Sequence, residues 1–216
     1  METITQLFQY IIHIDTYLVS FVAQYGAWTY VALFAIIFCE TGLVVTPFLP
    51  GDSLLFAAGS IAAQPDSNLQ IQFLFLLLLL ASIIGNKLNY TIGRLLGPRV
   101  FTAKQSRLLN KKHLEEAHLF YEKHGGKTII FARFLPIIRT FAPFVAGIGA
   151  MSISSFSFYN IISAFLWVGS LLGAGYYFGS LPIIKNNFSI VIYAIIAISL
   201  LPAALALINQ RKSVNS

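Results

Sequence analysis

Four charged residues lie in stretches of the chain that are otherwise apolar enough for a membrane. Arg133 and Arg139 are six residues apart within residues 128–151, and Glu40 and Asp52 flank a stretch rich in proline and glycine. A charged side chain at bilayer depth costs about 2.5–3.5 kcal/mol on insertion scales. These residues therefore point to a function. The planar forks of arginine suit a pair of phosphate oxygens, and a carboxylate can exchange protons.

The opposite signs of these charges suggest that they face one another in the folded protein. An unpaired charge is costly in a low dielectric, whereas paired charges share fields and hydrogen bonds. Burial and a neighbouring arginine act in opposite directions on the proton affinity of a carboxylate, and either makes it a plausible proton-coupling group. We therefore expect Glu40 and Asp52 to couple to protons and Arg133 and Arg139 to bind a phosphate or another substrate. The alternative is a static network of ion pairs that only fixes the fold.

The composition of the chain indicates a membrane protein. Of its 216 residues, 57% are hydrophobic and 10% are charged, whereas an ordinary soluble domain has about 25% charged residues. We expect an all-α polytopic membrane protein with a single domain. A single cysteine, Cys39, excludes an internal disulfide and offers no Cys-rich metal site, and no cofactor or metal is expected. The net charge of +6 lies mostly in one loop, which favours a membrane surface over nucleic acid as the partner.

Hydropathy and breaks in the apolar runs divide the chain into seven segments. The expected segments are an N-terminal amphipathic or spanning helix (4–24), a re-entrant hairpin (34–63), a transmembrane helix (69–92), a basic loop (94–127), a second re-entrant hairpin (128–151) and two further transmembrane helices (156–177 and 188–208).

Prolines and glycines interrupt both expected hairpins. The residues expected to break them are Pro47, Pro50 and Gly51 in the first hairpin and Pro136 and Pro143 in the second. Irregular backbone at membrane depth is tolerated only where it is buried in protein or faces water. The hairpins should therefore line a polar cavity inside the protein.

The distribution of positive charge predicts the topology. Residues 94–127 contain eight Lys and Arg residues against three Glu, so this loop should be cytoplasmic. The C-terminal tail carries Arg211 and Lys212 without an acid and should be cytoplasmic as well. The loop and the tail can both be cytoplasmic if residues 128–151 are re-entrant, because the chain then crosses the membrane twice between them. The hairpin that carries the acids would then enter from the opposite face of the membrane.

A weak internal repeat supports this arrangement. Residues 46–59 and 135–147 each contain two prolines, an apolar run and a terminal Ala-Gly, and a long apolar segment follows each of them. Inverted repeats of discontinuous helices, with binding sites near the midplane, are a known plan of transporters. The expected fold is therefore an inverted repeat of two re-entrant helical hairpins with transmembrane helices.

At these residues the chain resembles the DedA family, also called the SNARE-associated or VTT-domain membrane proteins. The matching segments are residues 40–52, 85–97 and 131–147, and the Arg-Phe-x-Pro-x-x-Arg core of the last segment is the most specific of them. The resemblance implies a protein of the bacterial cytoplasmic (inner) membrane with two facing hairpins. It also implies a link to the proton motive force, envelope integrity and cell division.

The resemblance also implies roles for individual residues. Glu40 and Asp52 match the essential acids of the family, and Arg133 and Arg139 match its essential arginines. Asn86 departs from the pattern, because many members carry an acid after the corresponding glycine. Some members of the family are implicated in returning undecaprenyl phosphate across the membrane, and eukaryotic relatives scramble phospholipids.

Two functions follow from this set of residues. The first is a transporter linked to the proton motive force that moves a lipid phosphate, such as undecaprenyl phosphate or a phospholipid. The second is a proton-coupled antiporter of a small cation or drug, in which the arginines only tune the acids. An enzyme is not expected, because no histidine lies beside the arginines in the sequence to act as a nucleophile. The sequence leaves the oligomeric state open, a homo-oligomer included.

Overall fold

The computed structural model describes residues 25–43, 51–65, 67–102, 125–149, 151–179, 181, 190–191 and 194–195. The regular elements described there are helices, namely α3 (Trp28–Gly42), α4 (Gly51–Ala62), α5 (Ile71–Thr102), α7 (Lys127–Ala132), α8 (Pro136–Ile148) and α9 (Ile153–Phe178). The expectation of an all-helical chain is therefore confirmed for these residues. The expected helix at 4–24, Pro47, Pro50 and most of the expected span at 188–208 lie outside the described residues.

Two helices in the described part of the chain are long and apolar enough to cross a membrane. They are the Ile71–Leu96 part of α5 and the whole of α9, each 26 residues long. A helix of that length extends about 39 Å, which exceeds the roughly 30 Å of a hydrocarbon core. α3 and α4 are also apolar, but they contain only 15 and 12 residues and are too short to cross. All four shorter helices, α3, α4, α7 and α8, pack against the two long helices.

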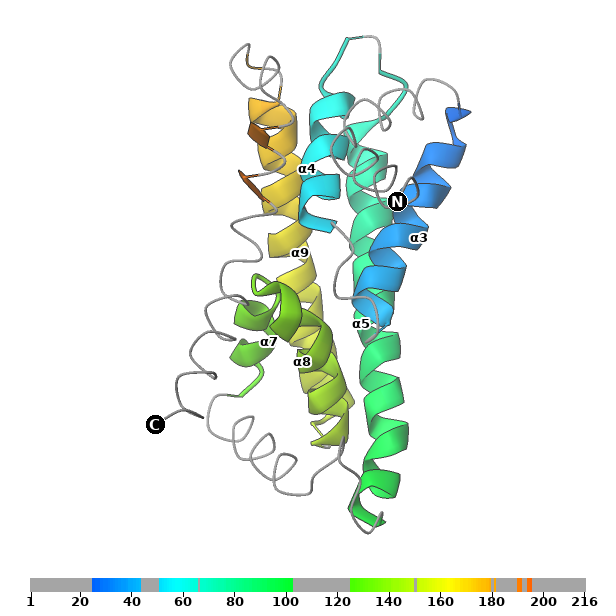
Figure 1. Ribbon diagram of the computed structural model, residues 1–216, viewed down its shortest axis with the longest axis vertical. Coiled ribbons are helices and arrows are strands. Elements are labelled where there is room, and N and C mark those ends of the chain that lie inside the picture. The colour runs from blue at the N-terminus through cyan, green and yellow to red at the C-terminus, as the bar shows by residue number, and fades with distance from the viewer. Residues whose placement is uncertain are drawn as a thin grey trace, which may run out of the picture.

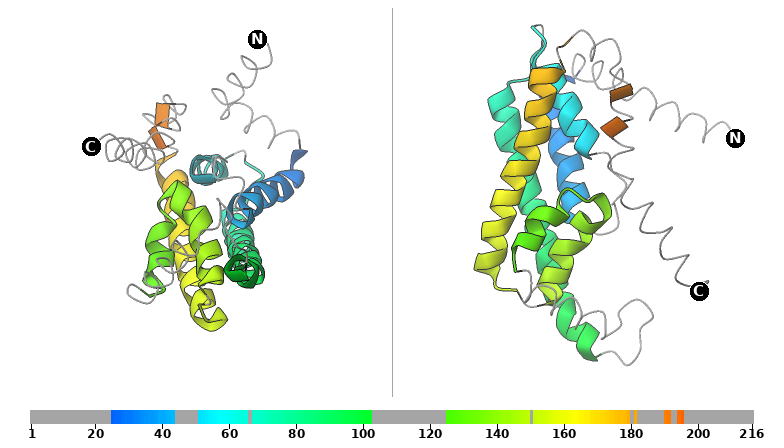
Figure 2. Two further views of the ribbon diagram at one scale, coloured as in Figure 1. Left: turned by 60° about the horizontal axis from the view of Figure 1, so that its bottom comes forward. Right: turned by 90° about the vertical axis from the view of Figure 1, so that its left-hand side faces the viewer.

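The short helices pack on the long helices in a crossed pattern (Figure 1). α3 packs on α5 and α7 packs on α9, whereas α4 packs on α9 and α8 packs on α5. In each half, the first short helix thus contacts the long helix that follows it, and the second contacts the long helix of the other half. Figure 2 shows α3 and α4 toward one end of the long helices and α7 and α8 toward the other.

Glycines allow close backbone contact where α4 crosses α9. A Cβ atom on Gly59 of α4 would collide with the backbone of Leu172 and Tyr176, and one on Gly175 of α9 would collide with the backbone of Phe56. Small residues let helix backbones approach closely inside membranes. The crossing of α4 and α9 therefore depends on these two glycines.

The crossing of α8 and α5 uses the same arrangement. A Cβ atom on Gly147 of α8 would collide with the backbone of Tyr90, and one on Gly93 of α5 would collide with the backbone of Phe144. Gly59 and Gly147 are the glycines that end the two weak repeats in the sequence. The two crossings therefore match in both the helices and the residue types that they use.

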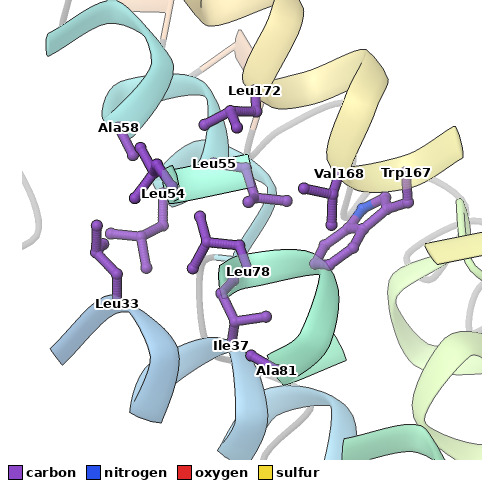
Figure 3. Close-up of a cluster of buried hydrophobic side chains, with 11 residues drawn as sticks. Leu33, Ile37, Leu54, Leu55, Ala58, Leu78, Ala81, Trp167, Val168 and Leu172 are labelled. Carbon is purple, nitrogen blue, oxygen red and sulfur yellow. The ribbon is translucent and has the colours of Figure 1, made fainter. Parts of the chain in front are cut away.

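A cluster of buried apolar side chains holds α3, α4, α5 and α9 together (Figure 3). Its buried members are Leu33, Ile37, Leu54, Leu55, Ala58, Leu74, Leu78, Ala81, Trp167, Val168 and Leu172. The Trp167 indole lies at the edge of this cluster in Figure 3. The apolar core therefore borders the region where the charged residues meet.

Two details differ from the sequence-based expectation. α5 continues to Thr102, ten residues beyond the expected end at residue 92, and Gly85 and Gly93 are close-contact positions inside this helix. Pro143 was expected to break the second hairpin, but that prediction is wrong, since Pro143 lies within α8, which continues to Ile148. Pro136 is the first residue of α8, where a proline is well tolerated because the first turn lacks intrahelical N–H bonds.

Candidate functional site

Arg139 joins both acidic residues in one ion-pair cluster. Its Nη1 atom lies 2.6 Å from Oδ1 of Asp52, and its Nη2 atom contacts Oε1 of Glu40. Glu40 is fully buried, Arg139 is 7% exposed, and the Asp52 side chain is 16% exposed. Charged groups this deeply buried are normally paired. The structure thus brings together three of the four charged residues that the sequence singled out.

The ends of three helices position this cluster. Glu40 lies in the last turn of α3, Asp52 in the first turn of α4, and Arg139 in the first turn of α8. The backbone N–H of Gly51 donates to Oε1 of Glu40 at 3.2 Å. The first turns of α4 and α8 thus both contribute to the cluster, and a helix N-terminus favours negative charge. The local field therefore suits carboxylates, and would also suit a phosphate.

Arg133 lies in the turn between α7 and α8 and has neutral partners. It donates to Oδ1 of Asn160 at 3.2 Å, to Oγ of Ser163 at 2.9 Å and to Oγ of Ser82. It is 3% exposed. Among the described residues, no carboxylate lies within ion-pair distance of Arg133. The two arginines therefore differ, because Arg139 is neutralised by acids whereas Arg133 is held by hydroxyl and amide oxygens.

Trp167 of α9 links the two arginines to Asp52. Its indole Nε1–H donates to Oδ1 of Asp52 at 2.8 Å. The Cζ atoms of Arg133 and Arg139 lie 5.3 and 5.2 Å from the centre of its ring, within the range of a cation–π interaction. Sequence reasoning missed this residue. Its signal was a tryptophan in the interior of an apolar span, since tryptophan in membrane proteins is enriched at the interfaces.

Three buried asparagines connect the helices around the cluster. Asn86 of α5 donates to Oδ1 of Asn160 of α9 at 3.0 Å, and Asn160 donates to the carbonyl of Ile83 at 3.0 Å. Asn86 is therefore a hydrogen-bond donor to the oxygen that also accepts from Arg133. An ionised acid at this position would have no hydrogen to donate, which gives the amide a structural reason in this chain.

Asn89 of α5 connects the two hairpins directly. Its Nδ2 atom donates to the carbonyl of Thr41 at the end of α3, at 3.3 Å, and to the carbonyl of Thr140 in α8, at 2.7 Å. The side chain is fully buried. A single amide thus satisfies backbone oxygens of both hairpins beside the ion-pair cluster. Neither the Asn86–Asn160 pair nor Asn89 was predicted as part of the site.

A small cavity lies between the two arginines. Its walls include Thr41, Asn86, Arg133, Arg139, Pro143 and Trp167. The cavity offers a volume of about 10 Å³ for the centre of a water molecule, which is room for about one water. The Nε atoms of both arginines are buried, and neither has a hydrogen-bond partner among the described residues. The cavity can therefore hold a single acceptor atom in this conformation, and a phosphate group would require it to widen.

Two further sequence-predicted residues, Gly51 and Pro143, lie beside this cluster. Gly51 is the first residue of α4 and touches Glu40, while Pro143 lines the small cavity from within α8. Among the described residues, no three His, Cys, Asp or Glu side chains come together as a metal site would require.

Comparison with known proteins finds a family model and several relatives that match the chain. Residues 49–177 match the model of the VTT domain. The chain is 50% identical to the Protein DedA of Escherichia coli (strain K12) over 213 residues, which are 99% of this chain and 97% of that protein. It is 33% identical to the Inner membrane protein YqjA of the same strain over 85% of this chain and 82% of the relative.

A protein from a second organism is also similar to this chain. An uncharacterized membrane protein of Mycobacterium tuberculosis (strain ATCC 25618 / H37Rv) is 40% identical over 83% of this chain and 78% of that protein. No solved structure matches the chain. The names of two of these relatives describe membrane proteins, and none of the three names a substrate.

Proposed function

The chain belongs to the DedA family of VTT-domain inner-membrane proteins, and from that premise we propose that it is a proton-coupled transporter of a lipid phosphate. The substrate class is an amphiphile with an anionic phosphate head, such as undecaprenyl phosphate or a phospholipid. Glu40 and Asp52 exchange the proton, and Arg133 and Arg139 bind the phosphate. Such an activity would support the integrity of the cell envelope.

The observation that carries this proposal is the sharing of Arg139 by two carboxylates. With all four residues ionised, two acids balance two arginines and the site is neutral. Uptake of one proton by an acid leaves the site with one net positive charge and weakens its hold on Arg139. A phosphate oxygen can then take the freed edge of the guanidinium, because arginine binds carboxylate and phosphate through the same fork.

Loss of that proton reverses the exchange. The ionised carboxylate competes for Arg139 again and displaces the phosphate, so proton release and substrate release are coupled. Arg133 contributes the second positive charge. Since its partners are neutral oxygens, a phosphate does not have to displace an acid from it. The small volume of the cavity supports assignment of this conformation to the closed state without substrate.

The crossed helix packing supports the expected inverted repeat. In the first half α3 packs on α5 and α4 on α9, and in the second half α7 packs on α9 and α8 on α5. Glycines make the close contacts at both the α4–α9 and the α8–α5 crossing. We propose that each pair of short helices is a re-entrant hairpin and that the two hairpins enter from opposite faces. The basic loop and the C-terminus are then cytoplasmic. Discontinuous helices that meet near the midplane give transporters a site reachable from either side.

Reconstitution into proteoliposomes tests the proposal. The assay follows translocation of labelled undecaprenyl phosphate, and in parallel of a labelled phospholipid, with and without a pH gradient. We expect wild-type transport to respond to the gradient. Transport should be abolished in four variants, namely R133A, R139A, E40Q and D52N. K87A is the matched control, because Lys87 is an exposed cation on α5. Unchanged transport by R139A in correctly inserted protein would refute the proposal.

One observation favours a second candidate. The two carboxylates converge on a single cationic group, which is also how acids would hold a small cation or drug. We infer that a proton-coupled antiporter is the alternative function, with Arg139 released when the cation binds. In that case R133A would retain cation-driven proton flux, and lipid phosphate would not compete with the cation.

A further inference from the structure

We propose that Trp167 is the positioning residue of the charged site. Its indole N–H holds Asp52, and the face of its ring holds both guanidinium groups. The inference rests on the proposed function for its transport test, while its geometric part can be tested without any substrate.

Trp167 donates a hydrogen bond to the carboxylate of Asp52. Oδ1 of Asp52 accepts from Nε1 of Trp167 at 2.8 Å and from Nη1 of Arg139 at 2.6 Å. Two donors on one oxygen fix the position of the carboxylate. Trp167 thus holds Asp52 where its Oδ1 atom also accepts from Arg139.

The indole ring of Trp167 also contacts both guanidinium groups. Arg133 and Arg139 carry the same charge in one buried region, so they repel each other. The negative face of an aromatic ring attracts a cation, most strongly for tryptophan, and both Cζ atoms lie within 5.3 Å of the centre of this ring. The ring therefore attracts both guanidiniums and counteracts their mutual repulsion without adding a further acid.

Trp167 shares one face of α9 with two hydrogen-bond partners of Arg133. Asn160 and Ser163, which accept from Arg133, lie seven and four residues before it on the same face of the helix. One face of α9 therefore contacts both arginines and Asp52. The indole is 1% exposed, and a phenylalanine would fill most of the same space. The N–H group and the indole ring are what distinguish tryptophan at this position.

The transport test compares W167F, W167L and a matched control. W167F retains an aromatic ring and loses the N–H, whereas W167L loses both. F156L is the control, because Phe156 is another fully buried aromatic residue of α9, and its ring stacks on Tyr90 rather than on Arg133 or Arg139. A merely structural role for Trp167 would give W167L and F156L the same effects.

We expect W167F to change the pH profile of lipid-phosphate transport, because the Asp52 carboxylate loses the hydrogen bond that Trp167 donates. Glu40, Arg133 and Arg139 face the same region and are present in every variant. W167L should also raise the half-saturating concentration of lipid phosphate by about tenfold, as loss of a buried cation–π contact would. F156L should leave the profile and the half-saturating concentration unchanged. A wild-type profile and half-saturation in both Trp167 variants would overturn the inference.

A spectroscopic test needs no substrate. The chain has two tryptophans, and Trp28 is 69% exposed on α3, so W28F leaves Trp167 as the only tryptophan. We expect D52A, R133A and R139A in this background each to change the Trp167 emission spectrum in proteoliposomes. S154A, at an exposed position of α9, should not change it. An unchanged spectrum in all three charge variants would overturn the inference, even if lipid phosphate is transported. Changed spectra without any wild-type transport would support the positioning role and reject the proposed function.

Discussion

The carboxylate of Glu40 lies directly against the Cα atom of Gly51. It accepts the backbone N–H of Gly51 at 3.2 Å, and a Cβ atom on Gly51 would overlap with it. Glu40 ends one short helix and Gly51 begins the next. The absence of a side chain at residue 51 is therefore what lets the Glu40 carboxylate reach both the first turn of α4 and Arg139.

This contact predicts the effect of G51A. The new methyl group would push the Glu40 carboxylate away from Arg139, and overpacking of this kind costs about 1–3 kcal/mol. We expect a lower melting temperature and loss of proton-coupled transport, measured by thermal unfolding and by the liposome assay. G173A is the control, because a Cβ atom on Gly173 meets no atom within 4 Å. Equal behaviour of the two variants would contradict the contact.

R139K tests whether the fork of Arg139 is required. A lysine keeps the charge but cannot hold Asp52 and Glu40 through two separate, fixed nitrogens. Loss of a hydrogen bond to a charged group amounts to about 1.5–3 kcal/mol, so we expect transport to fall by about tenfold or more. The measurement is the initial rate in proteoliposomes. K87R, the reverse exchange at an exposed position, should leave the rate unchanged. A wild-type rate for R139K would show that charge alone is sufficient.

D52N separates substrate binding from proton coupling. The amide keeps the shape of the side chain and an oxygen that can accept from Arg139 and Trp167, but it cannot titrate in the physiological range. We expect lipid-phosphate binding to D52N to depend less on pH than binding to the wild type, because only Glu40 can still exchange a proton. Binding to protein in detergent, measured across the physiological pH range, checks the expectation. Parallel pH profiles for D52N and wild type would exclude Asp52 as the proton site.

N89L removes the amide that connects the two hairpins. The carbonyls of Thr41 and Thr140 then lose their shared donor, and buried polar groups left unpaired cost about 1–3 kcal/mol. We expect a clear drop in melting temperature. T91A, which removes an exposed hydroxyl bonded within its own helix, should have little effect. An equal loss of stability in both variants would argue against the bridge.

The matched helix crossings predict matched responses to substitution. G59A on α4 and G147A on α8 each place a methyl group against the backbone of the long helix that they cross. We expect both variants to lose stability to a similar extent, measured as melting temperature in detergent. G169A is the control, since its Cβ atom would meet only the Phe75 ring at an ordinary 3.7 Å. Loss of stability in only one of the pair would count against an inverted repeat.

The sequence predicted much of what depends on local properties. Its apolar composition indicated a helical membrane protein, and the cost of burying charge marked Glu40, Asp52, Arg133 and Arg139 as residues that need partners. Both follow from transfer free energies, which each residue carries wherever it lies in the chain. Three of these residues form one ion-pair cluster. Arg133 lies beside it on the ring of Trp167.

Only the tertiary structure decided which groups meet. Arg139 is 99 residues from Glu40 and 87 from Asp52, and Trp167 is 115 residues from Asp52. No local pattern contains these pairings, because they result from the crossed packing of α4 on α9 and α8 on α5. The same packing keeps Pro143 inside a helix and makes glycines into contact points. Hydropathy and the cost of burying charge therefore determined which residues matter, whereas the crossings of distant helices determined what each one binds.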